Sequence, residues 1–128
     1  MPSMYGDIAL YTGTASPELA REVAQALGVE LSGSDVFKFP NDNIFIRLHG
    51  SVRSRDVFII QPTCPPVNTN IMQLLIYIDT MKRDSAGRVT AVVPYSAMAA
   101  PTRRISRACP SPLAWWPTLS RWRALTAA

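Results

Sequence analysis

Apolar residues between positions 8 and 95 recur with two different periods, and this pattern predicts alternating strands and helices. Residues 8–11 and 57–60 are short apolar runs bounded by polar residues, which is typical of buried strands. Residues 44–49 alternate apolar and polar side chains, so this strand has two unlike faces. The predicted strands cover residues 8–11, 36–39, 44–49, 57–60 and 89–95.

Helical spacing of apolar residues predicts two helices between these strands. The first begins at Ser16, which can cap it, has Pro17 at its first position, and ends at Gly28 in a left-handed conformation. The second is capped by Asn68 or Thr69 and is apolar nearly all round, so we expect it to be deeply buried. This order of elements predicts an α/β domain with a mainly parallel sheet flanked by helices.

The composition fits one domain with an ordinary core, because 48% of the 128 residues are hydrophobic. No apolar run approaches the roughly 18 residues that cross a bilayer. The first residues also lack the pattern of a secretory leader, so we expect a cytoplasmic protein with no membrane partner. The two cysteines are too few for a disulfide framework or a structural zinc site.

The net charge of +4 is concentrated in one part of the chain. All nine acidic residues precede residue 95, whereas residues 96–128 contain five arginines, no acid and all three tryptophans. The basic character therefore belongs to residues 96–128, and it does not indicate nucleic-acid binding by the whole chain.

His49 is the only histidine, and a lone histidine is more often a surface or strand-face residue than a catalyst, so the sequence gives no support to a nucleophilic triad or a histidine metal site. Glycine-rich phosphate-binding motifs are also missing from the sequence. Residues 12–16 could face an anion at a helix N-terminus, but an ordinary strand-to-helix turn is the simpler interpretation. We therefore assign no catalytic residue and no metal ligand.

A turn-like pentapeptide carries the best candidate for ligand contact. The ring of Phe39 could stack on a flat base, and the amides of Asn41 and Asn43 could hydrogen-bond to its edge. The same residues also make a good turn, so both interpretations stay open. Arg53 and Arg55 could hold phosphate oxygens, or they could simply be solvated.

Several segments resemble a known family in sequence, order and spacing. They are residues 10–20 (LYTGTASPELA), 39–44 (FPNDNI), 51–53 (SVR), 56–68 (DVFIIQPTCPPVN), 70–75 (NIMQLL) and 85–95 (SAGRVTAVVPY). Together they resemble the opening of ribose-phosphate pyrophosphokinase, or phosphoribosyl pyrophosphate synthetase. The resemblance implies a phosphoribosyltransferase-like N-terminal domain, transfer of pyrophosphate from ATP to ribose 5-phosphate, use of Mg²⁺, and assembly into homodimers and hexamers.

The resemblance also implies roles for five residues. Phe39 matches the ring that packs on the adenine of ATP, and Asn41 and Asn43 match its polar partners across a subunit interface. The family usually has glutamate where Asn43 stands. Ser51 and Arg53 match positions near a regulatory phosphate or ADP site. The family's catalytic residues and magnesium ligand match no residue before Tyr95.

The resemblance stops after Tyr95, where the family continues with arginine and lysines that hold the ATP phosphates. With suitable codons, moving the reading frame back by one base converts Met98–Ser106 into the family-like peptide YGRTDKKDQ. We therefore predict that residues 1–95 form an incomplete N-terminal domain. Residues 96–128 are predicted to be a non-homologous, out-of-frame tail that is poorly ordered.

One functional expectation and two alternatives follow. We expect a fragment of ribose-phosphate diphosphokinase that is inactive by itself, because the cations that would hold the triphosphate are missing after Tyr95. The first alternative is a non-catalytic partner of an intact synthetase. The second, which we favour least, is binding of protein or nucleic acid through the basic tail around Trp115 and Trp116.

Overall fold

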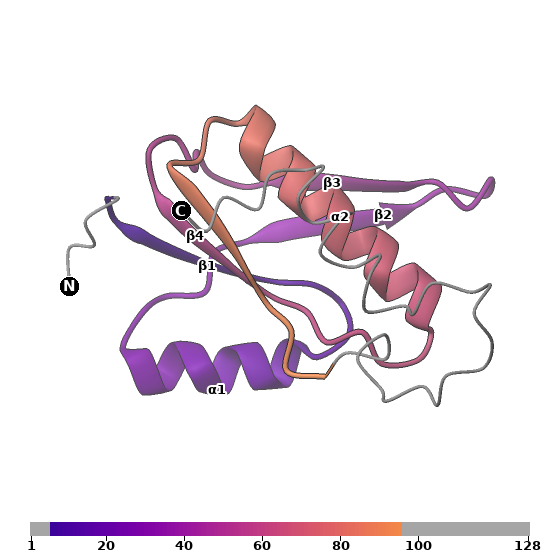
Figure 1. The fold of residues 1–128 in the computed structure, drawn as a ribbon, viewed down its shortest axis with the longest axis horizontal. Coiled ribbons are helices and arrows are strands. Elements are labelled where there is room, and N and C mark those ends of the chain that lie inside the picture. Colours follow the sequence, from indigo (N-terminus) through magenta and orange to yellow (C-terminus); the bar gives the residue numbers. More distant parts are fainter. Residues whose placement is uncertain (1–5, 96–128) are drawn as a thin grey trace, which may run out of the picture.

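The structure is a computed structural model that describes residues 6–95 (Figure 1). The elements follow the predicted order. They are β1 (Ile8–Thr12), α1 (Pro17–Leu27), β2 (Ser34–Lys38), β3 (Ile44–Leu48), β4 (Asp56–Ile60), α2 (Val67–Arg83) and β5 (Arg88–Val92).

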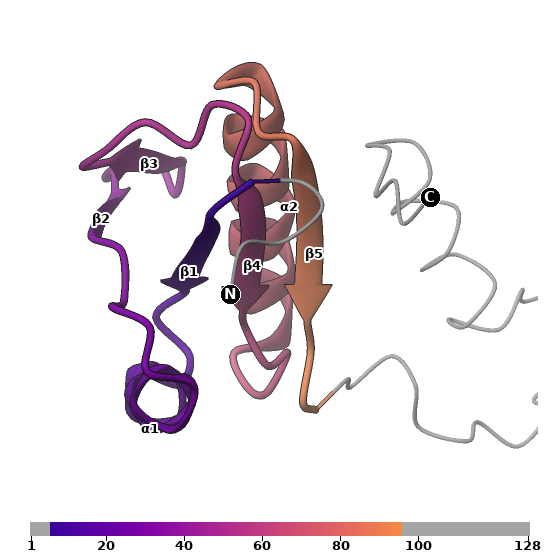
Figure 2. The same cartoon turned by 90° about the vertical axis from the view of Figure 1, so that its left-hand side faces the viewer.

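β1, β4 and β5 form a parallel sheet in the order β1-β4-β5. The central strand is β4, and its Val57 and Ile59 are fully buried because neighbours cover them on both sides. α1 and α2 lie on opposite faces of this sheet (Figure 2). Side chains alternate between the two faces, so one apolar cluster forms under each helix. The predicted α/β fold with a parallel sheet flanked by helices is confirmed.

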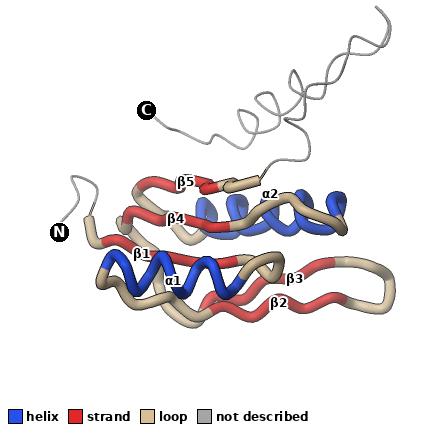
Figure 3. Tube along the Cα trace, turned by 90° about the horizontal axis from the view of Figure 1, so that it is seen from below, coloured by secondary structure: helices blue, strands red, loops and turns tan. Residues whose placement is uncertain are grey.

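β2 and β3 form a separate antiparallel hairpin that extends beyond the end of the sheet (Figures 1 and 3). Its inner face packs against the cluster under α2 through Ile46, which is buried, and through Ile44 and Leu48. Its outer face carries Phe37 directly opposite Phe45, and both rings are exposed. The alternation along residues 44–48 therefore separates a core face from an open face.

The two ends of α1 agree with the sequence only in part. Gly28 ends the helix in the left-handed region with a φ of 65°, as predicted. Ser16 occupies the N-cap position, but its side chain makes no capping hydrogen bond, so that expectation is wrong. Instead, the backbone carbonyl of Ser16 accepts the N–H of Ala20 at 3.4 Å, and this contact begins the helix without the hydroxyl.

α2 begins two or three residues earlier than expected, so the prediction that Asn68 or Thr69 caps it is wrong. The N-cap is Pro66, with an extended backbone at φ −75° and ψ 112°. Its carbonyl accepts the N–H of Asn70 at 3.1 Å, which starts the helix at Val67. Proline fits beside a helix start because its missing N–H is not needed there.

α2 is also less deeply buried than its composition predicts, since Met72 is 51% exposed. The cluster between the sheet and the hairpin contacts one side of the helix, through Leu74, Tyr77, Ile78 and Met81. β5 ends at Val92, before residue 95, because Pro94 has no N–H to continue the ladder. Within residues 6–95, no helix combines the length and apolarity that crossing a membrane requires.

Candidate functional site

The turn between β2 and β3 brings three predicted ligand contacts together at the tip of the hairpin. The N–H of Phe39 donates to the carbonyl of Asn43 at 2.8 Å, which closes the turn. The N–H of Asn43 donates to Oδ1 of Asn41 at 3.2 Å. Asp42 adopts a left-handed φ of 63° and pairs with Lys38 at 3.0 Å. The turn interpretation of this pentapeptide is thus confirmed, and the same turn fixes the spacing of the ring and the two amides.

The ring of Phe39 is 47% exposed, so one of its faces can accept a planar partner. Farther back on the hairpin, Phe37 and Phe45 contact each other with ring centroids 6.2 Å apart. The Arg47 guanidinium carbon lies 5.6 Å from the centroid of Phe37. Phe39 lies outside this cluster at the tip, which makes it the aromatic ring best placed for an external ligand.

Ser51 and Arg53 lie at the other end of β3, in the connection to β4. β3 has five residues, so roughly 13 Å of strand separates this connection from the hairpin tip. The side chain of Val52 is fully buried and anchors the connection to the core. Ser51 and Arg53 are exposed on either side of it. The structure therefore places the two groups of predicted site residues at separate locations.

Two backbone N–H groups of this connection donate hydrogen bonds to side-chain oxygens. The N–H of Arg53 donates to Oγ of Ser51 at 3.3 Å, and the N–H of Val52 donates to Oδ2 of Asp84 at 3.4 Å. The N–H of Ser54 donates to the carbonyl of Ser85 at 2.9 Å. The connection is thus held against the turn that follows α2.

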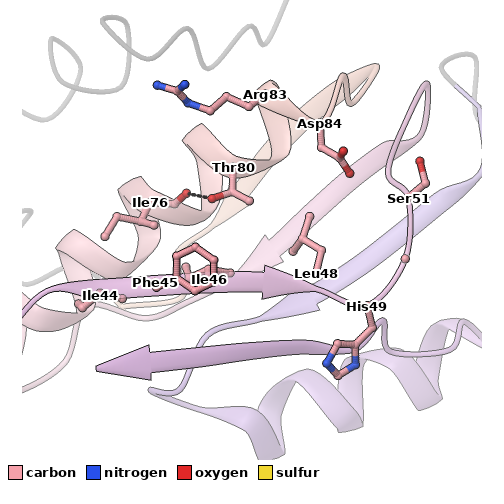
Figure 4. A pocket seen from close by; sticks show the side chains of 11 residues that line it. Ile44, Phe45, Ile46, Leu48, His49, Ser51, Ile76, Thr80, Arg83 and Asp84 are labelled. Atoms are coloured by element: carbon pink, nitrogen blue, oxygen red, sulfur yellow. Dashed lines mark hydrogen bonds between the residues drawn. The ribbon is translucent and has the colours of Figure 1, made fainter. Parts of the chain in front are cut away.

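A groove of about 620 Å³ runs between β3 and α2 and ends at this connection (Figure 4). Its apolar part is lined by Ile44, Ile46, Leu48 and Ile76. Its polar end is lined by Ser51, Thr80, Arg83 and Asp84. Thr80 donates its hydroxyl to the carbonyl of Ile76 at 2.8 Å, so that hydroxyl is engaged within the helix. The groove can accept an apolar body at one end and a polar group at the other.

Arg55 and His49 each make a polar contact within the protein, which gives them a structural role. Both line a second cavity of about 350 Å³, together with the buried Tyr11. Arg55 donates from Nη2 to the carbonyl of Ile8 at 3.2 Å, and His49 Nε2 lies 2.8 Å from a carboxylate oxygen of Asp35. Burial raises the pKa of Tyr11 above its ordinary value of 10.0, so its hydroxyl stays protonated near neutral pH.

Sequence reasoning missed a buried polar cluster at the carboxyl ends of β1 and β4. Oε1 of Gln73 accepts three hydrogen bonds: from the Thr14 N–H at 2.9 Å, the Thr14 hydroxyl at 3.1 Å and Gln61 Nε2 at 2.8 Å. Gln61 also accepts the Ala15 N–H at 3.3 Å and donates to Asn70 at 3.4 Å. These bonds fix the loop between β1 and α1 against α2.

The signal for this cluster was present in the sequence. Asn70 and Gln73 are polar residues three positions apart in an otherwise apolar stretch, and Gln61 directly follows a buried strand. Buried amides need partners, so such positions predict a mutual contact. The loop they hold lies at the carboxyl edge of a parallel sheet, where α/β proteins commonly bind ligands.

Metal binding finds no support in the described part of the chain. Residues 6–95 contain no cluster of three or more histidine, cysteine, aspartate or glutamate side chains that could hold an ion.

Comparisons with known proteins agree with this geometry. The family model for the N-terminal domain of ribose phosphate pyrophosphokinase matches residues 8–113. A ribose-phosphate pyrophosphokinase from Clostridium perfringens is 48% identical over 98 residues, which is 77% of this chain and 31% of the relative. The chain thus spans about a third of that curated relative's length.

Two solved structures are also similar. A phosphoribosylpyrophosphate synthetase from Mycobacterium smegmatis matches with a TM-score of 0.85 and 34% identity, covering 92% of this chain and 40% of that one. A purine phosphoribosyltransferase from Pyrococcus horikoshii matches with a TM-score of 0.50 and 15% identity, over 71% of this chain and 65% of that one. The second likeness concerns the fold alone.

Proposed function

The chain belongs to the ribose phosphate pyrophosphokinase family, and we propose that its described part provides the adenine-contacting surface of an ATP site. The turn that joins Phe39, Asn41 and Asn43 carries this proposal. It presents an exposed ring beside two exposed amides, the combination that a purine base requires. Because Oδ1 of Asn41 accepts a backbone N–H, its amide NH₂ is the group left to donate to the base.

An ATP titration with two matched variants tests the proposal. Phe39→Ala removes the ring at the tip, whereas Phe37→Ala removes a ring of similar exposure from within β2. Stacking of a base on an aromatic ring contributes about 1–3 kcal/mol, so Phe39→Ala should weaken ATP binding roughly 5- to 150-fold. Phe37→Ala should change it much less. Equal losses in the two variants, measured by calorimetry, would contradict the assignment.

We further propose that the family's transfer reaction does not proceed on this chain by itself. Transfer of a pyrophosphoryl group depends on cations positioned around the phosphates. Residues 96–101 (SAMAAP) follow Tyr95 and contain no cation. The purified chain, incubated with ATP, ribose 5-phosphate and Mg²⁺, should release no AMP above a protein-free blank. Sustained release of AMP would overturn this proposal.

A phosphate site at Ser51 and Arg53 is the regulatory part of the same proposal. Its support is local: a hydroxyl, a guanidinium and two backbone N–H groups lie within three consecutive residues. Such groups favour oxyanions over other ligands. Titration with inorganic phosphate tests it, and Arg53→Gln should abolish saturable binding.

Association with another synthetase subunit is the second candidate function. The outer face of the hairpin supports it, because Phe37, Phe39 and Phe45 are 40%, 47% and 48% exposed. Exposed aromatic groups of this kind are enriched at protein interfaces. The chain should therefore co-purify with an intact synthetase or with a second copy of itself, and Phe45→Glu should reduce that association. Unchanged recovery of the variant would remove the hairpin as the contact.

A further inference from the structure

Asp84 is an acidic residue in a position where it does not stabilise its own helix. It is the C-cap of α2, so its carboxylate lies near the negative end of the helix dipole. The preceding residues, Lys82 and Arg83, are cations of the type that favours this end. Helix stability therefore gives no reason for a carboxylate at this position.

The contact that Asp84 makes is instead with the connection after β3. Its Oδ2 accepts the N–H of Val52 at 3.4 Å, between the two residues of the proposed phosphate site. Figure 4 shows Asp84 at the end of α2 near the loop that carries Ser51, at the polar end of the groove. A carboxylate has the charge and the acceptor atoms of an oxyanion. The Asp84 carboxylate therefore occupies the position that a phosphate ligand would take at Val52.

The bonds that hold this arrangement are long. The Val52 N–H bond to Asp84 is 3.4 Å and the Arg53 N–H bond to Ser51 is 3.3 Å, against about 2.9 Å for a well-formed bond. A phosphate oxygen could replace both acceptors. It would have to displace the Asp84 carboxylate or bind beside it, and like charges repel at such a distance.

We infer that Asp84 is an internal competitor for the Ser51–Arg53 phosphate site, so that this chain binds phosphate there more weakly than its donors alone would allow. The inference rests on the proposed phosphate site. Other charged groups at the groove do not cancel the effect, because Arg83 pairs with Asp79 at 2.9 Å and His49 pairs with Asp35 at 2.8 Å.

Inorganic phosphate titrated into the full ¹⁵N-labelled chain tests the inference, with the amide signals of Val52 and Arg53 as the readout. Asp84→Asn keeps the size and an acceptor oxygen but removes the charge, and it should bind phosphate roughly five- to tenfold more tightly than the parent chain. Glu22→Gln removes an equal charge from an exposed position on α1, on the opposite side of the sheet, and should leave the affinity unchanged.

The outcomes separate the inference from the proposal beneath it. Equal phosphate affinity in the parent chain and Asp84→Asn, with loss of binding in Arg53→Gln, would overturn the competitor role and leave the phosphate site standing. No saturable binding in the parent chain, Asp84→Asn and Asp84→Ala would overturn the site itself. A dispersed ¹⁵N spectrum for each variant establishes that it is folded.

Discussion

Gly13→Ala should destabilise the protein through one buried side chain. Gly13 is buried at the carboxyl end of β1, and a Cβ atom there would lie 2.0 Å from Oε1 and 2.4 Å from the amide carbon of Gln61. Real Cβ contacts do not come that close, so the Gln61 amide must move by more than 1 Å. The Gln61 bonds to Gln73, Ala15 and Asn70 all depend on that amide.

The size of the expected loss in unfolding free energy follows from the burial of Gln61. Gln61 has no exposed surface, so water cannot replace the bonds that it loses. Leaving a buried polar group without its partner costs about 1–3 kcal/mol, and the 2.8 Å bond from Gln61 to Gln73 is the strongest at risk. Alanine also lowers the entropy of the unfolded chain, which offsets roughly 0.4–1 kcal/mol. The net loss in unfolding free energy should be about 1–2 kcal/mol.

Urea denaturation followed by circular dichroism measures this loss. Gly50→Ala is the matched control, because a Cβ at Gly50 meets no atom within 4 Å and its backbone needs no positive φ. Gly50→Ala should stay within about 0.5 kcal/mol of the parent chain. In a Gln61→Ala background, Gly13→Ala should become nearly neutral, since the clashing amide is gone. A Gly13→Ala variant as stable as the control would refute the reasoning.

Three further predictions concern other parts of the described domain. Asp56→Asn should cost about 3 kcal/mol in urea denaturation, because Asp56 is 1% exposed and holds Arg88 through two bonds; a loss below 1 kcal/mol would contradict this. Ser54→Gly should raise the urea midpoint by the equivalent of about 1 kcal/mol, since Ser54 adopts a φ of 57°, and a lower midpoint would contradict it. Burial raises the pKa of Tyr11 and Tyr77 above 10.0, so the stability they contribute is fully present below pH 10.0 and is lost as the pH rises through their higher folded-state values. Thermal denaturation between pH 9 and pH 12 should show that loss, and replacing both tyrosines by phenylalanine should remove it.

The strands and helices were predictable because periodicity reports which face is buried. β4 was recognised as a central strand from four consecutive apolar residues, and the structure buries it between two neighbours. Gly28 was recognised from its place after the apolar face of α1. Both signals are local, which is why one sequence suffices for them.

The helix starts were less predictable, because a capping residue competes with its neighbours. Ser16 has the right side chain, yet its hydroxyl makes no cap and the backbone carbonyl begins the helix alone. At α2, Asn68 and Thr69 are good caps by type, but the extended backbone of Pro66 starts the helix first. The type of side chain indicates that a helix begins nearby, but it does not determine which of several adjacent residues is the N-cap.

The candidate site was predictable where it is contiguous. Phe39, Asn41 and Asn43 lie within five residues, so one turn brings them together whatever the rest of the fold does. The amide cluster and the Asp84 contact join residues that are 9 to 59 positions apart. Polar residues in an apolar stretch indicate that buried partners exist, but their spacing does not identify all of those partners, because the contacts depend on how α2 packs against the loops at both of its ends.

Those two kinds of site differ in what they can do. The amide cluster is buried and its members bond to one another, so it makes the loop at Thr14 and Ala15 rigid. The hairpin tip is exposed and held by a few turn bonds, so its ring and amides remain accessible. A rigid loop at the sheet edge can position a ligand only in one way, whereas an exposed tip can contact a ligand that lies outside the sheet. The base contact that we propose at the tip should therefore be separable from the sheet edge, and variants of Phe39 should alter nucleotide affinity without altering the stability of the sheet.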